Sequence, residues 1–247
     1  RGEGRRRERR QRSHFAKGRI PIAIAFFQIY TYVAMQRRFS SSSGHGYAEQ
    51  QCSSTNRHPG IAASTSCVAR TVARSAMPVL TTMGRRILHT GSLGSASILK
   101  VVTNYLATAN LLTLSEALVT SAAAGMDLNT TYEAIRISSG NSFVHETESQ
   151  VILNGSRDIN FTMDLVVKDM TLFSDVAARA EVPLEVAPLL LGVFEDGQER
   201  YGPREWSPNI IRRLEEPTGL DVRAQGFPAE MVDDEPEEPG YEVVPRR

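Results

Sequence analysis

Lysine is the rarest basic residue of this chain and the one best suited to proton chemistry. Among its 28 lysines and arginines only three are lysines, at Lys17, Lys100 and Lys168. Arginine keeps its charge at any pH that a protein meets, whereas lysine can exchange a proton with a substrate. A lysine retained among so many arginines therefore indicates proton transfer or a compact ammonium contact. Codon bias with three surviving lysines is the alternative explanation.

Lys100 stands in an apolar stretch, ILKVVTNYL at residues 98–106, and Asn104 follows it four positions later. On a helix this spacing brings the two side chains onto one face. An ammonium group among apolar side chains must find an anionic partner or give up its proton, so Lys100 is a candidate proton donor or acceptor. Asn104 can offer a donor and an acceptor to a substrate carboxylate or hydroxyl. The alternative is a lysine that reaches solvent from a helix N-terminus.

The element that must position these residues is a long apolar helix. Between Ser95 and Gly125 the only charged residues are Lys100 and Glu116, and a helix that is hydrophobic nearly all round is expected to be buried. Gly125 is expected to end it and Asp127 to cap the next helix. Further helices are predicted at 128–138, 143–153, 161–180, 184–200 and 208–215, after a short strand at 87–89. The predicted fold is an all-α helical bundle.

Lys168 lies on the predicted helix at 161–180. It shares a helical stripe with Leu165, Leu172 and Val176, and this stripe predicts that it faces a pocket. A solvated position on the flank of the helix is the alternative.

Several short blocks around these residues occur in a fixed order. GSLG at 91–94 precedes Lys100 and Asn104, and FTMDLVVKDM at 161–170 contains Lys168. Between them lie Glu116-Ala117, Gly125-Met126-Asp127 and Ser138-Ser139-Gly140. This series resembles the C-terminal helical domain of the β-hydroxyacid dehydrogenases, the family of 3-hydroxyisobutyrate dehydrogenase, over residues 77–213. The expected domain fold is thus similar to the C-terminal domain of 6-phosphogluconate dehydrogenase.

The resemblance implies an oxidoreductase that interconverts a 3-hydroxyacid and its semialdehyde with NAD or NADP, without a metal. It implies that Lys100 is the catalytic acid/base, that Asn104 binds the substrate and that Lys168 approaches the cofactor. A non-catalytic helical module for dimerisation or partner binding is the alternative from another class. A 6-phosphogluconate dehydrogenase-like enzyme ranks lower. Such an enzyme has a Lys-x-x-His block, and this chain has Asn104 where the region of that histidine would fall. Under both hypotheses, the oxidoreductase and the non-catalytic module, we expect a homo-oligomer formed through the helical domain.

One part of the family pattern is not found. The dinucleotide-binding (Rossmann) domain of such enzymes opens with a strand and G-x-G-x-x-G, and residues 1–76 contain neither a βαβ pattern nor this motif. We therefore expect a C-terminal fragment that lacks the Rossmann domain. Residues 77–90 would be a remnant of that domain, and residues 91–215 the substrate and dimerisation domain. Such a fragment is expected to need the missing domain for NAD(P) binding and activity.

The ends of the chain differ strongly in charge. Residues 1–90 carry 16 basic against 3 acidic residues, and residues 214–247 carry 10 acidic against 3 basic ones, an asymmetry typical of tails around a folded middle. Residues 1–76 are expected to be a disordered, transit-peptide-like segment or a misread non-coding stretch, and residues 216–247 an acidic disordered tail. No nucleic-acid or membrane partner is predicted. A mitochondrial and a cytoplasmic location both stay open.

Overall fold

The computed structural model describes residues 74–246 except 83, 85 and 232–238. The expectations for residues 1–73, Lys17 among them, lie outside this part of the chain. The chain divides into two compact units: Arg1–Ser97 with Pro236–Arg247 form unit 1, and Ile98–Glu235 form unit 2.

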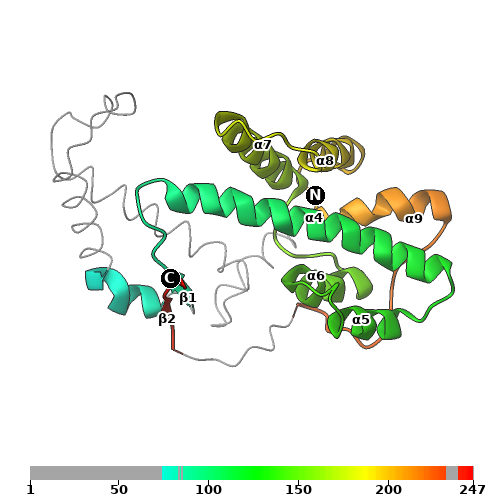
Figure 1. Cartoon of the computed structure of the whole chain (residues 1–247). Helices are drawn as coiled ribbons and strands as arrows, with labels where there is room; N and C mark the ends of the chain where they lie inside the picture. The colour runs from blue at the N-terminus through cyan, green and yellow to red at the C-terminus, as the bar shows by residue number, and fades with distance from the viewer. Residues whose placement is uncertain (1–73, 83, 85, 232–238, 247) are drawn as a thin grey trace, which may run out of the picture. The chain divides into compact units, whose positions relative to one another are not determined.

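Helices dominate the described residues, as the sequence predicts, and no Rossmann sheet is found among them. Residues 74–82 are helical, and the one described sheet has two strands. The elements, drawn in Figure 1, are β1 (Arg86–Leu88), α4 (Ser95–Ala123), α5 (Leu128–Arg136), α6 (Phe143–Leu153), α7 (Met163–Arg179), α8 (Ala187–Tyr201), the 3-10 helix η1 (Ser207–Ile211), α9 (Arg212–Thr218) and β2 (Tyr241–Val243). In unit 2 the other helices surround α4, which is the long central helix of the bundle (Figure 1).

Local sequence signals set the ends of α4. Gly91 and Gly94 have φ of +111° and +90°, so the chain turns there before the helix begins. At the other end Gly125 has φ of +76°, and the Met126 amide donates to the Ser121 carbonyl, which closes the last turn. Asp127 then caps α5, because its Oδ1 accepts from the Thr130 amide at 2.8 Å. These expected boundaries are confirmed.

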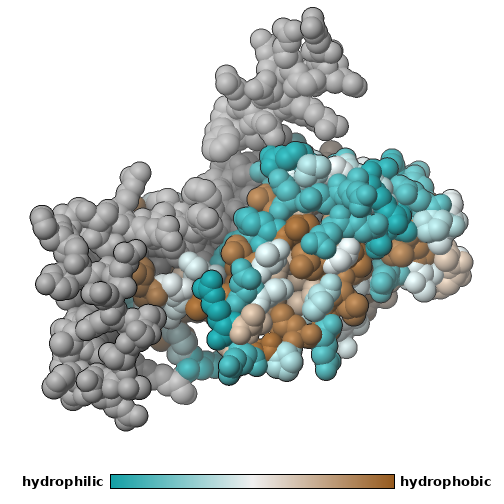
Figure 2. All heavy atoms as spheres, turned by 90° about the horizontal axis from the view of Figure 1, so that it is seen from above, coloured by the Kyte–Doolittle hydropathy of each residue, from teal (hydrophilic) through white to brown (hydrophobic). Residues whose placement is uncertain are grey.

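The packing of α4 differs from the expectation that the helix is buried all round. Leu111 and Leu118 are 3% and 0% exposed, but Leu99 and Leu106 are 41% and 54% exposed. The prediction of full burial was wrong. Apolar composition shows that a helix can be buried, but it does not show which of its positions the neighbouring elements cover. Apolar side chains also reach the surface among polar ones on the face of the molecule that Figure 2 shows.

The core of unit 2 combines buried residues of several helices. Its members are Leu111, Leu114, Leu118, Val119, Val144, Ile152, Leu153, Met163, Val166, Met170, Ala187, Leu190, Phe194, Ile210, Ile211 and Val222. Helix α8 approaches η1 closely at Gly197, where an added Cβ would lie 2.6 Å from Ile210 Cδ1. The sequence predicts one helix at 208–215; η1 and α9 share that stretch instead, since a 3-10 turn often begins a helix.

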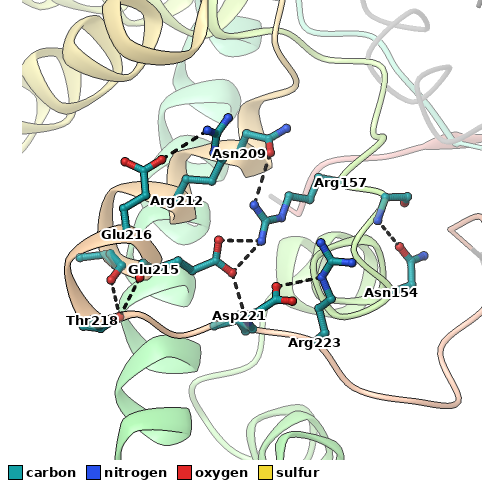
Figure 3. Close-up of polar contacts among 12 residues, drawn as sticks. Asn154, Arg157, Asn209, Arg212, Glu215, Glu216, Thr218, Asp221 and Arg223 are labelled. Atoms are coloured by element: carbon teal, nitrogen blue, oxygen red, sulfur yellow. Dashed lines mark hydrogen bonds and ion pairs between the residues drawn. The ribbon is translucent and has the colours of Figure 1, made fainter.

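A buried ion pair closes unit 2 on its C-terminal side (Figure 3). Arg157, in the loop between α6 and α7, donates from Nη2 to both carboxylate oxygens of Glu215 on α9, at 2.6 and 2.7 Å. Glu215 Oε1 also accepts from the Val222 amide at 2.9 Å, and Val222 is 0% exposed. The acidic tail was expected from residue 216, but α9 continues to Thr218 and the chain stays packed at Val222. Composition points to disorder here, whereas the buried carboxylate needs partners and holds this segment in place.

Among the described residues, no helix is both long and apolar enough to cross a lipid bilayer.

Candidate functional site

Two residues of α4 and one acidic residue of α7 form a buried polar junction in unit 2. Lys100 Nζ and Asn104 Nδ2 both donate to Asp169 Oδ2. The side chains of Lys100, Asn104 and Asp169 are 13%, 3% and 2% exposed. The predicted pairing of Lys100 and Asn104 on one helical face is confirmed, because one turn of α4 aims both side chains at the same oxygen.

Asp169 is the residue that sequence reasoning missed. It belongs to the Lys-Asp pair of the 161–170 block, but the sequence alone assigns it no role. The available signal was the buried stripe of α7, on which Asp169 adjoins Met170 and Val166. A carboxylate on a buried stripe requires a cation or several donors, and Lys100 is the one cationic residue of α4.

Lys168 lies at the edge of this junction rather than on the inner side of α7. Its side chain is 51% exposed, and Leu172 on the same stripe is 44% exposed. The buried positions of α7 are Met163, Val166, Asp169, Met170 and Ala177. The prediction that the stripe with Lys168 faces inward was therefore wrong. The buried stripe of α7 lies about one residue further along the helix and contains Asp169 instead. Lys168 Nζ still lies 3.2 Å from Asp169 Oδ1, so the second lysine is brought to the same carboxylate.

An aromatic stack holds α4 against α7 beside the junction. The rings of Tyr105 and Phe173 have centroids 4.3 Å apart and planes 3° apart. Tyr105 directly follows Asn104, and Phe173 lies one turn after Asp169. The stack is expected to fix the spacing between the two helices and hence the positions of the polar groups.

Two acceptor atoms of the junction have no hydrogen-bond donor among the described residues. They are Asn104 Oδ1 and Asp169 Oδ1, both buried; the ammonium of Lys168 lies at ion-pair distance from the latter without completing a hydrogen bond. A buried acceptor without a donor is unfavourable, so these atoms can accept a hydrogen bond from a hydroxyl group of a bound molecule. With two ammonium groups and one carboxylate, the junction carries a formal charge of +1, which suits an anionic ligand.

A second cluster with catalytic residue types is structural. His145 Nδ1 and Ser149 Oγ lie 2.8 Å apart, and His145 Nε2 lies 2.9 Å from the Tyr132 carbonyl oxygen. His145 and Ser149 are 1% and 0% exposed, and burial lowers the pKa of His145. A neutral imidazole thus joins α6 to α5, and no substrate reaches the serine. The described residues also contain no group of three or more metal-binding side chains.

The described helical domain thus brings a lysine and an asparagine, one turn apart on α4, to a Lys-Asp pair on α7. Residues 94–214 match the family model described as NAD-binding of NADP-dependent 3-hydroxyisobutyrate dehydrogenase. The helical domain of this chain belongs to the 3-hydroxyisobutyrate dehydrogenase family.

Relatives of known activity agree with this assignment. The chain is 34% identical to 2-(hydroxymethyl)glutarate dehydrogenase of Eubacterium barkeri over 146 residues, which cover 59% of this chain and 48% of the relative. It is 28% identical to L-threonate dehydrogenase of Escherichia coli K12 over 135 residues, covering 54% and 45%. The chain spans about half the length of the relatives that it matches.

Solved structures show the same fold. A 3-hydroxyisobutyrate dehydrogenase from Salmonella typhimurium superimposes with a TM-score of 0.52 at 26% identity, over 57% of this chain and 50% of that one. The 3-hydroxyisobutyrate dehydrogenase of Mycobacterium tuberculosis has a TM-score of 0.52 at 21% identity, over 58% and 52%, and supports the fold alone.

Proposed function

We propose that residues 94–214 supply the proton-transfer and substrate-binding half of an oxidoreductase that interconverts a 3-hydroxyacid and its semialdehyde with NAD or NADP. The observation that carries this proposal is the convergence of Lys100, Asn104 and Lys168 on the carboxylate of Asp169.

Lys100 is the acid/base of the proposed reaction. Lys100 Nζ donates to Asp169 Oδ2, and in the reduction it would give a proton to the carbonyl oxygen of the semialdehyde. In the oxidation Lys100, in its neutral amine form, would take the proton of the substrate hydroxyl, and the hydride of the breaking carbon–hydrogen bond would pass to the nicotinamide of a bound NAD(P). Asp169 acts as a positioning residue, because its carboxylate stabilises the ammonium and orients it.

Asn104 positions the reacting hydroxyl. Because Asp169 is an acceptor, it orients the amide so that Nδ2 faces the carboxylate and Oδ1 faces away from it. Asn104 Oδ1 accepts no hydrogen bond from the described residues, so it can accept one from a hydroxyl. Of the two groups that the sequence left open for Asn104, a substrate carboxylate and a substrate hydroxyl, we therefore assign it to the hydroxyl.

The residues present fit a cofactor at the edge of the junction. Lys168 is half exposed and its ammonium is only partly compensated by Asp169 Oδ1, so it can contact a negatively charged dinucleotide. A bound nicotinamide supplies the hydride acceptor or donor that no side chain of the junction can replace. We propose that its phosphates are held by a dinucleotide-binding domain of the kind that the family resemblance implies.

The test is a chimeric protein that joins the preceding half of the Eubacterium barkeri relative to residues 77–247 of this chain. NAD(P)-linked oxidation of 2-(hydroxymethyl)glutarate, L-threonate and 3-hydroxyisobutyrate is then measured. Lys100→Arg should lower kcat by about 100-fold or more, since arginine keeps the charge but not the exchangeable proton. Lys168→Arg should mainly raise KM for the cofactor. Asp175→Asn, an exposed carboxylate on the same helix α7, is the control.

Near-normal turnover of Lys100→Arg would remove Lys100 from the reaction. A folded chimera that oxidises none of these acids and binds neither NAD nor NADP would overturn the proposal as a whole.

The exposed face of α4 favours a second candidate function, self-association. Ile98, Leu99 and Leu106 are 48%, 41% and 54% exposed on a helix with almost no charge, and such a surface is typical of a protein interface. We propose that the helical domain forms a homo-oligomer through this face, with or without catalysis. Leu106→Glu should shift the mass measured by light scattering to that of a monomer, whereas Thr113→Glu at another exposed position of α4 tests whether any charge suffices.

A further inference from the structure

Residues outside the family match form a separate strand contact in unit 1. Strand β2 runs parallel to β1, with Arg86 opposite Tyr241, Ile87 opposite Glu242 and Leu88 opposite Val243. Figure 1 shows the two strands side by side although they lie about as far apart in sequence as the described chain allows. Neither strand lies within residues 94–214, so the contact is additional to the domain that defines the family.

The residue before β2 is fitted to its surroundings. A Cβ atom on Gly240 would collide with the carbonyl oxygen of Gly84 and would lie 2.5 Å from that of Thr81. Both obstacles are backbone atoms, which cannot turn aside as a side chain can. The Gly84 amide donates to the Leu80 carbonyl at 2.9 Å, and Leu80 is 6% exposed, so the helix end on which Gly240 rests is itself anchored. Only glycine fits this position.

Strand β1 needs a neighbour. A pair of three-residue strands has little stability by itself, and parallel strands are normally covered. Ile87 is 7% exposed, yet Leu88 remains 41% exposed. An uncovered strand edge presents free amide and carbonyl groups that attract another strand. A segment that pairs selectively with this edge of β1 would therefore stabilise the strand.

We infer that Thr81, Gly84 and Arg86–Leu88 form a strand-docking site for an extended segment of the type Gly-Tyr-Glu-Val, and that residues 239–246 of this chain are its occupant. The backbone ladder supplies the attraction, as in other cases of β-strand addition. The close fit at Gly240 supplies the selectivity, because a side chain at that position would push the whole segment away from β1. The docked strand thereby protects the edge of β1 from foreign strands. This inference is independent of the proposed function.

The first test measures amide hydrogen exchange at residues 86–88 in the full chain. Gly240→Ala should accelerate exchange there by about 10-fold or more, since an undocked strand leaves these amides open to solvent. Gly192→Ala is the matched control: it makes the same chemical change on α8, where an added Cβ meets nothing within 4 Å. Glu242→Pro tests the same docking by another route, because proline removes an amide from β2.

The second test supplies the segment in trans. A fluorescent peptide PGYEVVPR, with the sequence of residues 239–246, is titrated into the full-length Gly240→Ala protein, whose own segment no longer fits. Binding should be at least about 10-fold tighter than to the wild-type protein, where the site is filled. The peptide PAYEVVPR should bind neither protein.

Unchanged exchange at residues 86–88 in both Gly240→Ala and Glu242→Pro would overturn the inference. Equal binding of the two peptides, or no binding of PGYEVVPR to Gly240→Ala, would overturn the glycine-selective site. Circular dichroism checks that the helical content of each variant is that of the wild type, so that a general loss of structure is recognised.

Discussion

Replacing Asp169 by asparagine removes one negative charge from the junction and leaves its shape unchanged. The Lys100 ammonium, 13% exposed, then loses its ion-pair partner in a buried setting. Breaking a buried ion pair from one side costs about 3–5 kcal/mol in general. The lysine retains a path toward solvent, so we expect the free energy of unfolding to fall by about 2–3 kcal/mol.

The second donor of the junction makes the smaller contribution to this loss. Asn104 Nδ2 now donates to a charged oxygen, and in the variant it would donate to a neutral amide oxygen. This exchange weakens one hydrogen bond by about 1 kcal/mol. The expected loss therefore comes mainly from Lys100, and a double-mutant cycle can isolate it.

Urea unfolding of wild type, Asp169→Asn, Lys100→Met and the double variant gives the coupling energy between the two side chains. Helix content and the fluorescence of Trp206, the only tryptophan of the chain, report unfolding independently. We expect a coupling of about 1–3 kcal/mol, with the double variant more stable than the sum of the single losses predicts. Asp175→Asn, an exposed carboxylate on α7, should change the unfolding free energy by less than about 0.5 kcal/mol.

A coupling indistinguishable from zero would refute the reasoning, because Lys100 and Asp169 would then be independent in solution. It would also remove the geometric support for Lys100 as the acid/base, since Asp169 is what holds its ammonium beside Asn104.

Three further predictions concern stability. Glu215→Gln should lower the free energy of unfolding by about 3 kcal/mol, because it leaves the Arg157 guanidinium buried without its carboxylate; a midpoint in urea equal to that of wild type would contradict this. Burial raises the pKa of Glu148 from 4.5 to about 8, so the folded state holds this proton more tightly and wild-type stability should fall as pH rises through that window. Glu148→Gln should therefore raise the free energy of unfolding by roughly 2–4 kcal/mol at pH 9 and by nearly nothing at pH 4. If urea titrations showed the same gain in unfolding free energy at both pH values, the raised pKa of Glu148 would not be its cause. On α8, Gly197→Ala should destabilise by about 1–3 kcal/mol through contact with the 3-10 helix η1, whereas Gly192→Ala should raise the melting temperature slightly because open space surrounds it; equal shifts in the two variants would show that packing at Gly197 is loose.

The sequence by itself determined the elements of unit 2 and two residues of the site. Helix boundaries follow from contacts within a few residues, such as the turn at Gly125 and the cap at Asp127. For the same reason the spacing of Lys100 and Asn104 sufficed to place them on one face of α4, and the order of the short sequence blocks around them sufficed to indicate the family.

Only the tertiary structure decided how these elements meet. The bonds from Lys100 and Asn104 to Asp169 span 69 and 65 residues, a separation at which local propensity carries no information. Lys168 shows the limit most clearly: a small helical rotation decides between a buried stripe and solvent, and the packing of α7 against its neighbouring helices sets that rotation. The contact of Gly240 with Gly84 likewise depends on backbone atoms brought together from distant parts of the chain, which no pattern of side-chain types records.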